Sequence, residues 1–224
     1  MGLEEVKPAF NRDLLRRVIR EADAWLSERD KVREEAIRIA RDVNRYSGWA
    51  VTAVHKGDFD EALSHLSKAS EAAKRLLELV SPYPELANAG FAASALAEYA
   101  EASIFVGVVL GRGLPTPEDL GVGYVAYLQG LGDAVGEFRR LALEFARRGE
   151  IEVAWRLLEA MEAIYLELRA LDYPEALAPG IRHKADVARR LVDDTKALLI
   201  DVEYVSRLQA ALREAEKRGS AEKT

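Results

Sequence analysis

Two glutamates, Glu98 and Glu101, are the only charged side chains in residues 88–110, a stretch rich in alanine and valine. Residues three apart on an α-helix share one face, so the two Cβ atoms would lie about 5–6 Å apart. The other side chains expected on that face are Phe91, Ser94, Phe105 and Val109, so we do not expect it to be a solvated stripe. An unpaired buried carboxylate is unfavourable and needs a proton, a cationic partner or a metal ion. The simplest partner is an arginine from a neighbouring helix or subunit, and a metal ion is the alternative.

A second pair of acids, Asp133 and Glu137, lies four residues apart and also shares one helical face. Asp133 is the only charged side chain in residues 120–136. Arg140 and Glu144 continue the same face, so an ordinary polar stripe would also explain Glu137. Glycines disfavour a helix interior by about 1 kcal/mol each, but their small size lets a helix or a ligand approach closely. The segment contains three of them, Gly130, Gly132 and Gly136.

The two pairs would form one cluster if their helices pack together. Helices joined by a short connection are usually antiparallel neighbours, and we expect that here. Four carboxylates at close quarters repel one another unless protons or cations offset their charge. Oxygen ligands without cysteine or clustered histidine favour Mg²⁺, or Mn²⁺, over Zn²⁺. Such a site is typical of phosphodiester or phosphoanhydride hydrolysis. A di-iron bundle is disfavoured, because no histidine follows a glutamate by three residues in these helices.

A basic stripe precedes the acids. Arg38, Arg41, Arg45 and Lys56 fall on one helical face with Trp49 between them. The opposite face carries Ile39, Val43, Ala50 and Val54. Cations interleaved with an aromatic side chain can hold a phosphate backbone and stack a base, so these four residues are candidates for nucleic-acid binding. A solvated face of an amphipathic helix would look the same.

The apolar period is helical throughout, which predicts an all-α bundle of seven helices. Asn11 or Asp13 can cap the first helix, and Thr116 with Pro117 can open the fifth. The first expected helix ends near residue 28, and the second spans about 30–56. The third follows Asp58 and ends near residue 80. The last four span about 85–110, 117–148, 150–171 and 181–218. We expect one domain over residues 1–224, with residues 1–9 and 219–224 as flexible ends.

The composition of the chain excludes several kinds of site and surface. The chain has 224 residues, no cysteine and a formal net charge of −6, which excludes disulfides, thiolate metal sites and a uniformly basic surface. The first residues carry acids and no apolar core, so no secretory signal is expected and the cytoplasm is the expected compartment. Residues 88–110 are long enough to span a bilayer, but two central acids favour a helix buried in protein.

The acidic segments resemble the translin/trax family. EYAEASIF resembles a Glu-Tyr-Val-Glu-Ala segment of trax-type members, and YLQGLGDAVGEFRR resembles their Tyr-Leu-x-Gly-Val-x-Asp-Leu-x-Gly-Glu-Leu segment. The matching positions are Glu98, Tyr99, Glu101, Ala102, Tyr127, Leu128, Gly130, Asp133, Gly136 and Glu137. Leu131 departs from the family's valine, and Ala134 and Val135 depart from its Leu-x. IRHKADVARR at 181–190 resembles a later Leu-Arg-Arg-Lys-Tyr-Asp run, through Arg182, Lys184 and Asp186.

The resemblance implies an all-α subunit that assembles into a closed octameric shell around nucleic acid. It also implies a trax-like, Mg²⁺-dependent endoribonuclease for single-stranded RNA, with single-stranded DNA as a second ligand. The metal and catalytic residues would be Glu98, Glu101, Asp133 and Glu137, holding one or two ions that activate a water to attack the phosphodiester. Translin-type subunits lack the acid at Asp133, so its presence favours the catalytic type. We expect a homo-oligomer, because nothing in the sequence indicates a second subunit.

Two other functions fit the same residues. A translin-like shell could bind RNA or single-stranded DNA without cutting it. All-α Mg²⁺-dependent nucleoside triphosphate pyrophosphohydrolases also use Glu-x-x-Glu followed by a later acid pair. The segment at 181–190 and the long flanking helices favour the translin/trax reading.

Overall fold

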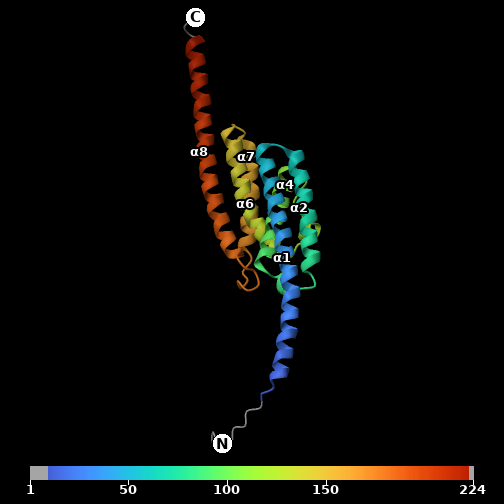
Figure 1. Cartoon of the computed structure of the whole chain (residues 1–224). Helices are drawn as coiled ribbons and strands as arrows, with labels where there is room; N and C mark the ends of the chain where they lie inside the picture. The colour runs from blue at the N-terminus through green and yellow to red at the C-terminus, as the bar shows by residue number, and fades with distance from the viewer. Residues whose placement is uncertain (1–9, 222–224) are drawn as a thin grey trace, which may run out of the picture.

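The computed structural model describes residues 10–221 and contains only helices and their connections within that range. The long helices form an elongated bundle, with the start of the first helix and the end of the last helix at its opposite ends (Figure 1). The helices are α1 (Arg12–Lys56), α2 (Phe59–Val80), α3 (Pro84–Ala87), α4 (Gly90–Val109), α5 (Pro117–Leu120), α6 (Tyr124–Arg147), α7 (Ile151–Arg169) and α8 (Ile181–Ala221). The all-α prediction is confirmed.

The predicted break near residue 29 is wrong, because α1 is one continuous helix of 45 residues. The sequence there, ERDK, has neither glycine nor proline, so nothing interrupts the backbone hydrogen bonds. The predicted ends of the helix are right. The Asn11 side chain accepts hydrogen bonds from the amides of Asp13 and Leu14, and Gly57 ends the helix at φ 81°.

Two predicted helices begin with a separate single turn. Pro84 opens α3 and the chain re-enters a helix only at Gly90, after the bend at Asn88. Thr116 and Asp119 form the capping box of α5, with Pro117 at its first position, as predicted. Gly121, at φ 67°, then ends that turn before α6 begins. The count is therefore eight helices within residues 10–221, not seven, and six of them are long.

Helices α4 and α6 are parallel, whereas we predicted an antiparallel pair. Gly130 of α6 lies against Ala97 and Glu101 of α4, and further along Phe138 lies against Phe105, with ring centroids 5.5 Å apart. Residue numbers therefore increase in the same direction on both helices.

The connection between α4 and α6 explains the parallel arrangement. It runs back along α4, so that Pro115 packs near Gly107. The carbonyl of Pro115 then accepts a hydrogen bond of 2.8 Å from the hydroxyl of Tyr127, near the start of α6. The pair still brings the acids of both helices to one level of the bundle.

Helix α4 occupies the middle of the bundle and packs against α1, α2 and α6. Among the described helices it alone has the length and hydropathy of a membrane span, with a mean hydropathy of 1.3 over an 18-residue window. In this structure 61% of that window is buried against the rest of the protein. Its apolar side chains are therefore those of a central core helix, as expected from the two acids it carries.

Both long terminal helices extend beyond the bundle. The first part of α1 projects at one end and the last part of α8 at the other (Figure 1). Helix α8 continues to Ala221, past the predicted end at residue 218. The expected flexible ends at 1–9 and 222–224 lie outside the described residues, while 219–221 belong to α8.

Candidate functional site

Glycine at position 130 brings the two acidic helices into contact. A Cβ atom at Gly130 would lie 2.5 Å from the carbonyl oxygen of Ala97 and 2.6 Å from the amide nitrogen of Glu101. No larger residue fits at that separation, so Gly130 fixes the distance between α4 and α6. Asp133 and Glu137 follow on the same helix, and their charges act on Glu101. All four predicted acids therefore belong to one cluster.

Glu101 is the acid most affected by this cluster. Burial raises its pKa to about 8, and the charges of Glu98, Asp133 and Glu137 add to that rise. Within residues 10–221 its carboxyl group has no hydrogen-bond or ion-pair partner from another side chain. Glu101 is therefore protonated at neutral pH in the absence of a cation.

Glu98 lies at the rim of the cluster. Its side chain is exposed, as is Ser94 one turn earlier, so this edge of α4 does reach solvent, contrary to our prediction for that face. Phe105, on the same face, is fully buried as predicted. Partial desolvation raises the pKa of the Glu98 carboxyl, and the charge of Asp133 raises it further.

Glu137 is held by a histidine that the sequence analysis did not select. His55 Nε2, at the end of α1, lies 2.5 Å from a carboxylate oxygen of Glu137. This hydrogen bond holds the pKa of Glu137 below its usual range. The His55 ring also packs on Phe105, with centroids 5.2 Å apart, and Phe105 packs on Phe138. An apolar wall therefore supports the charged pair.

Asp133 is held by Lys184 from α8, whose ammonium group donates a hydrogen bond to the carboxylate. A Cβ atom at Gly132 would lie 2.8 Å from the Cβ of Lys184, so the glycine makes room for α8 beside the acids. Lys184 belongs to the segment 181–190 that carried part of the family resemblance, and this contact gives that segment a place in the site. The sequence signal for Lys184 was present, but that for His55 was only its position on the mainly apolar side of α1.

The donor set fits a hard divalent cation. Four carboxylates from two helices supply oxygen ligands. Burial raises the pKa values of Glu98 and Glu101, and repulsion from the neighbouring acids adds to the rise. As the side chains stand, no group of three or more His, Asp or Glu residues within residues 10–221 is placed to hold a metal ion, so the acid side chains would have to move to bind one. Glu101 would exchange its proton for the cation, and the charge of Lys184 shows that the cluster accepts positive charge.

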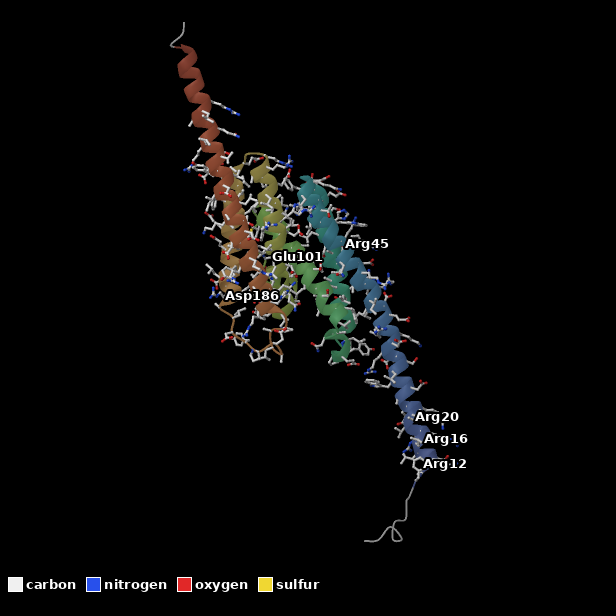
Figure 2. The ribbon with its side chains drawn as sticks, turned by 90° about the vertical axis from the view of Figure 1, so that its left-hand side faces the viewer. Arg12, Arg16, Arg20, Arg45, Glu101 and Asp186 are labelled. Atoms are coloured by element: carbon white, nitrogen blue, oxygen red, sulfur yellow. The ribbon has the colours of Figure 1, made fainter. Side chains whose placement is uncertain are left out.

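The predicted basic stripe faces a different side of the bundle. Arg38 donates two hydrogen bonds to Glu35, at 2.8 and 2.5 Å, and Arg45 donates one of 2.6 Å to Asp42. Figure 2 shows Arg45 on α1 at one side of the bundle and Glu101 near its middle. Trp49 packs against His65 of α2, with ring centroids 5.2 Å apart.

Arg41 and Lys56, the remaining members of the stripe, form no such pairs with the described part of the chain. Arg41 is exposed, and Lys56 lines a cleft of about 290 Å³ with Trp49 and His65. The opposite face, Ile39, Val43, Ala50 and Val54, is buried as predicted. The structure therefore brings the four acids together but places the stripe toward α2, away from them.

Known structures and relatives resemble this chain over most of its length. No protein-family model matches it. The structure of the AfC3PO–duplex RNA complex is 36% identical with a TM-score of 0.74, over 85% of this chain and 98% of that one. The crystal structure of AfC3PO is 34% identical with a TM-score of 0.76, over the same shares.

Two more distant matches agree with these. The crystal structure of apo-NeC3PO is 21% identical with a TM-score of 0.75, over 87% of this chain and the whole of that one, and so supports the fold alone. The uncharacterized protein MJ0175 of Methanocaldococcus jannaschii is 29% identical over 196 residues, which are 87% of this chain and 85% of that protein.

Proposed function

The chain belongs to the translin/trax family, since C3PO is the translin–trax complex, and on that basis we propose that it is a Mg²⁺-dependent endoribonuclease. The proposed reaction is hydrolysis of phosphodiesters in single-stranded RNA, in the cytoplasm, with single-stranded DNA as a further ligand. The observation that carries the proposal is Glu101, a half-buried acid that has no side-chain partner within residues 10–221 and that feels the charges of three other acids. Such an arrangement is costly for the fold and is common where charge has a function.

The four acids have different tasks in this proposal. Glu98, Glu101, Asp133 and Glu137 would hold the cation, Mg²⁺ or Mn²⁺. When bound, the ion supplies a Lewis acid that offsets charge on the phosphate and makes water a stronger nucleophile. His55 is a positioning residue, because its hydrogen bond fixes the Glu137 carboxylate. Lys184 instead occupies Asp133 in the absence of an ion, and would place a positive charge beside the reacting phosphate.

We propose that the chain acts as a closed homo-oligomeric shell, an octamer, around its substrate. The projecting parts of α1 and α8 support this, because they expose large apolar side chains that the rest of the described structure, residues 10–221, leaves uncovered. On α1 these are Leu14, Leu15, Val18, Ile19, Trp25 and Leu26, and on α8 they are Ile200, Tyr204, Val205, Leu208 and Leu212. AfC3PO has been seen with duplex RNA, so duplex and single-stranded RNA are both to be tested.

The proposal is tested by nuclease assays on Glu101→Gln. We expect wild-type protein to cut labelled RNA with Mg²⁺ and to stop in EDTA, and Glu101→Gln to lose cleavage by at least a hundredfold while its mass in solution is unchanged. Glu159→Gln, on the exposed side of α7, is the control for the loss of one charge and should keep full activity. Undiminished cleavage by Glu101→Gln would show that the site is elsewhere. A panel of nucleoside triphosphates in the same buffer tests the pyrophosphohydrolase alternative.

A binding-only protein is the second candidate. Its support is that Lys184 and His55 already satisfy Asp133 and Glu137, as in a structural cluster. RNA bound tightly but left uncut by wild-type protein with either Mg²⁺ or Mn²⁺ would favour this candidate over the nuclease.

A further inference from the structure

A cavity of about 430 Å³ opens directly beside the acid cluster. His55 and Gly136 line it, and both are adjacent to Glu137 in space or in sequence. A Cβ atom at Gly136 would have no neighbour within 4 Å, so the helix surface there is open. The cavity therefore adjoins the proposed catalytic site through His55 and Gly136.

Six of the seven residues that line the cavity belong to α6, and three of these are arginines. Arg139, Arg140 and Arg147 contribute three positive charges, and Glu144 contributes one negative charge. Arg147 is occupied, because its guanidinium donates hydrogen bonds of 2.9 and 2.7 Å to Glu144. The net charge at the mouth of the acid cluster is therefore positive, which suits an anion.

Arg139 and Arg140 retain hydrogen-bonding capacity. The Nε of Arg139 is buried and has no partner among the described residues. Among the side chains that the structure describes, Arg140 pairs only with Glu137, at a long 3.9 Å. A buried donor without a partner is unfavourable, and a phosphate oxygen would satisfy it with a charge-assisted hydrogen bond.

The α1 stripe lacks this capacity at two of its positions. Arg38 donates hydrogen bonds to Glu35 and Arg45 donates one to Asp42, at 2.5–2.8 Å. Their guanidinium groups would have to leave those partners to bind a phosphate. Arg139 and Arg140 would not, and they lie on the same helix as Asp133 and Glu137, within one or two turns.

We propose that this cavity is a phosphate subsite, in which Arg139 and Arg140 bind the RNA backbone next to the phosphodiester held at the acids. The inference rests on the proposed function, because it assumes that RNA is the substrate. Guanidinium groups suit this role because their planar donors match two phosphate oxygens at once. The backbone then follows α6 from Glu137 toward Arg147 and does not need the α1–α2 face.

The test is RNA binding measured without metal. A fluorescein-labelled RNA is titrated with full-length protein in EDTA, and anisotropy gives the Kd at several salt concentrations. We expect the double variant Arg139→Gln/Arg140→Gln to bind roughly ten- to a hundredfold more weakly. Its slope of log Kd against log salt should fall by about 1.4, the value for two lost contacts with single-stranded nucleic acid.

Two further pairs of substitutions control for charge and place. Arg156→Gln/Arg190→Gln removes the same charge from exposed positions on α7 and α8, and should change the Kd less than twofold. Arg38→Gln/Arg45→Gln tests the stripe. A larger loss in the stripe pair than in the α6 pair would overturn the subsite, as would equal losses in the α6 pair and the α7–α8 pair.

A single substitution and the wild-type protein distinguish failure of the subsite from misfolding and from failure of the proposed function. Arg140 is exposed, so Arg140→Gln alone is expected to fold and to weaken binding about fivefold, even where the change at half-buried Arg139 disturbs the helix. Unchanged affinity in a folded Arg140→Gln protein counts against the subsite. Wild-type protein that binds no RNA at all would instead overturn the proposed function.

Discussion

Lys184 of α8 donates a hydrogen bond to Asp133 of α6, and Gly132 is the residue that makes room for it. The chain thereby supplies one cation of its own to a cluster of four acids. The neighbouring acids sense it, because the Lys184 charge opposes the rise in the pKa values of Glu98 and Glu101. A divalent ion entering the cluster would meet this ammonium group beside one of its ligands.

Lys184→Gln is therefore expected to bind divalent cations more tightly. The substitution removes a positive charge that repels the incoming ion and competes for Asp133, and the affinity for Mn²⁺ should rise roughly threefold to tenfold. Isothermal titration calorimetry measures the Mn²⁺ affinity of the wild-type protein and of the variant. Lys196→Gln, which breaks a pair with Glu162 at 2.8 Å on the other side of α8, should leave the affinity unchanged. Weaker Mn²⁺ binding in Lys184→Gln would contradict the competition.

Metal binding should release a proton from Glu101. Its pKa is about 8 without a cation, so the protein must lose this proton to use the carboxylate as a ligand. The affinity for Mg²⁺ should therefore rise with pH and level off above about pH 8. Titrations in two buffers of different ionisation enthalpy count the protons released. No release at pH 7, or the same release in Glu101→Gln, would exclude Glu101 as the source.

The same acid should make the fold less stable as the pH rises. The folded-state pKa of Glu101 is raised from its ordinary value of 4.5, so the unfolded chain gains charge first. Its contribution to the free energy of unfolding is full below about pH 4.5, falls as the pH rises, and is lost above about pH 8. Glu101→Gln should therefore be more stable than wild type by on the order of 2 kcal/mol at pH 8, and equal to it near pH 4. Urea denaturation in EDTA at both pH values measures the difference, and no gain at pH 8 would contradict the raised pKa.

Local signals in the sequence predicted most helix ends correctly. Asn11, Gly57 and the Thr116–Pro117 pair act as predicted, because capping depends on neighbouring residues. The break near residue 29 was wrong because Asp30 can cap a helix but nothing there forces one to end. The direction of α6 relative to α4 was also wrong, since it depends on contacts such as that between Tyr127 and Pro115.

The candidate site was predictable only in part, for the same reason. The spacing of Glu98, Glu101, Asp133 and Glu137 assigns each pair to one face, and the structure joins the pairs into one cluster. His55, on α1, is 82 residues away in the sequence from its partner Glu137. Lys184, on α8, is 51 residues away from its partner Asp133. A pattern of neighbouring residues does not predict a contact between residues so far apart in the sequence.

Gly130→Ala should weaken both the fold and the site. The added Cβ would meet backbone atoms of Ala97 and Glu101 at 2.5 and 2.6 Å, so α4 and α6 must separate. We expect a loss of about 1–3 kcal/mol in the free energy of unfolding, together with weaker Mn²⁺ binding in the protein that remains folded. Gly48→Ala is the matched control, because it too replaces a helical glycine but has no neighbour within 4 Å. It should gain about 0.5–1 kcal/mol. Equal effects of the two substitutions would show that Gly130 has no special packing role.

The projecting part of α1 should be an interface between subunits. Val18, Ala36 and Val54 are 18 residues apart, which is five whole turns, so they lie on one line along the helix. Ala36 and Val54 are buried in the bundle, whereas Val18 is 48% exposed. The arm therefore carries the same packing face as the rest of α1, but nothing in the described residues 10–221 packs against it. A second copy of this chain is the partner we propose.

Val18→Glu should reduce the oligomer without unfolding the subunit. A charge on the apolar line of the arm opposes its burial against another copy, while the exposure of Val18 means that the subunit's own core does not depend on it. Sedimentation velocity should show a smaller species than wild type, with unchanged helix content by circular dichroism. Ala24→Glu adds the same charge on the opposite, polar side of the arm, where Arg16 and Arg20 also lie (Figure 2), and should leave the mass unchanged. If Val18→Glu keeps the wild-type mass, the arm is not the interface; if both variants dissociate, charge and not the apolar face is responsible.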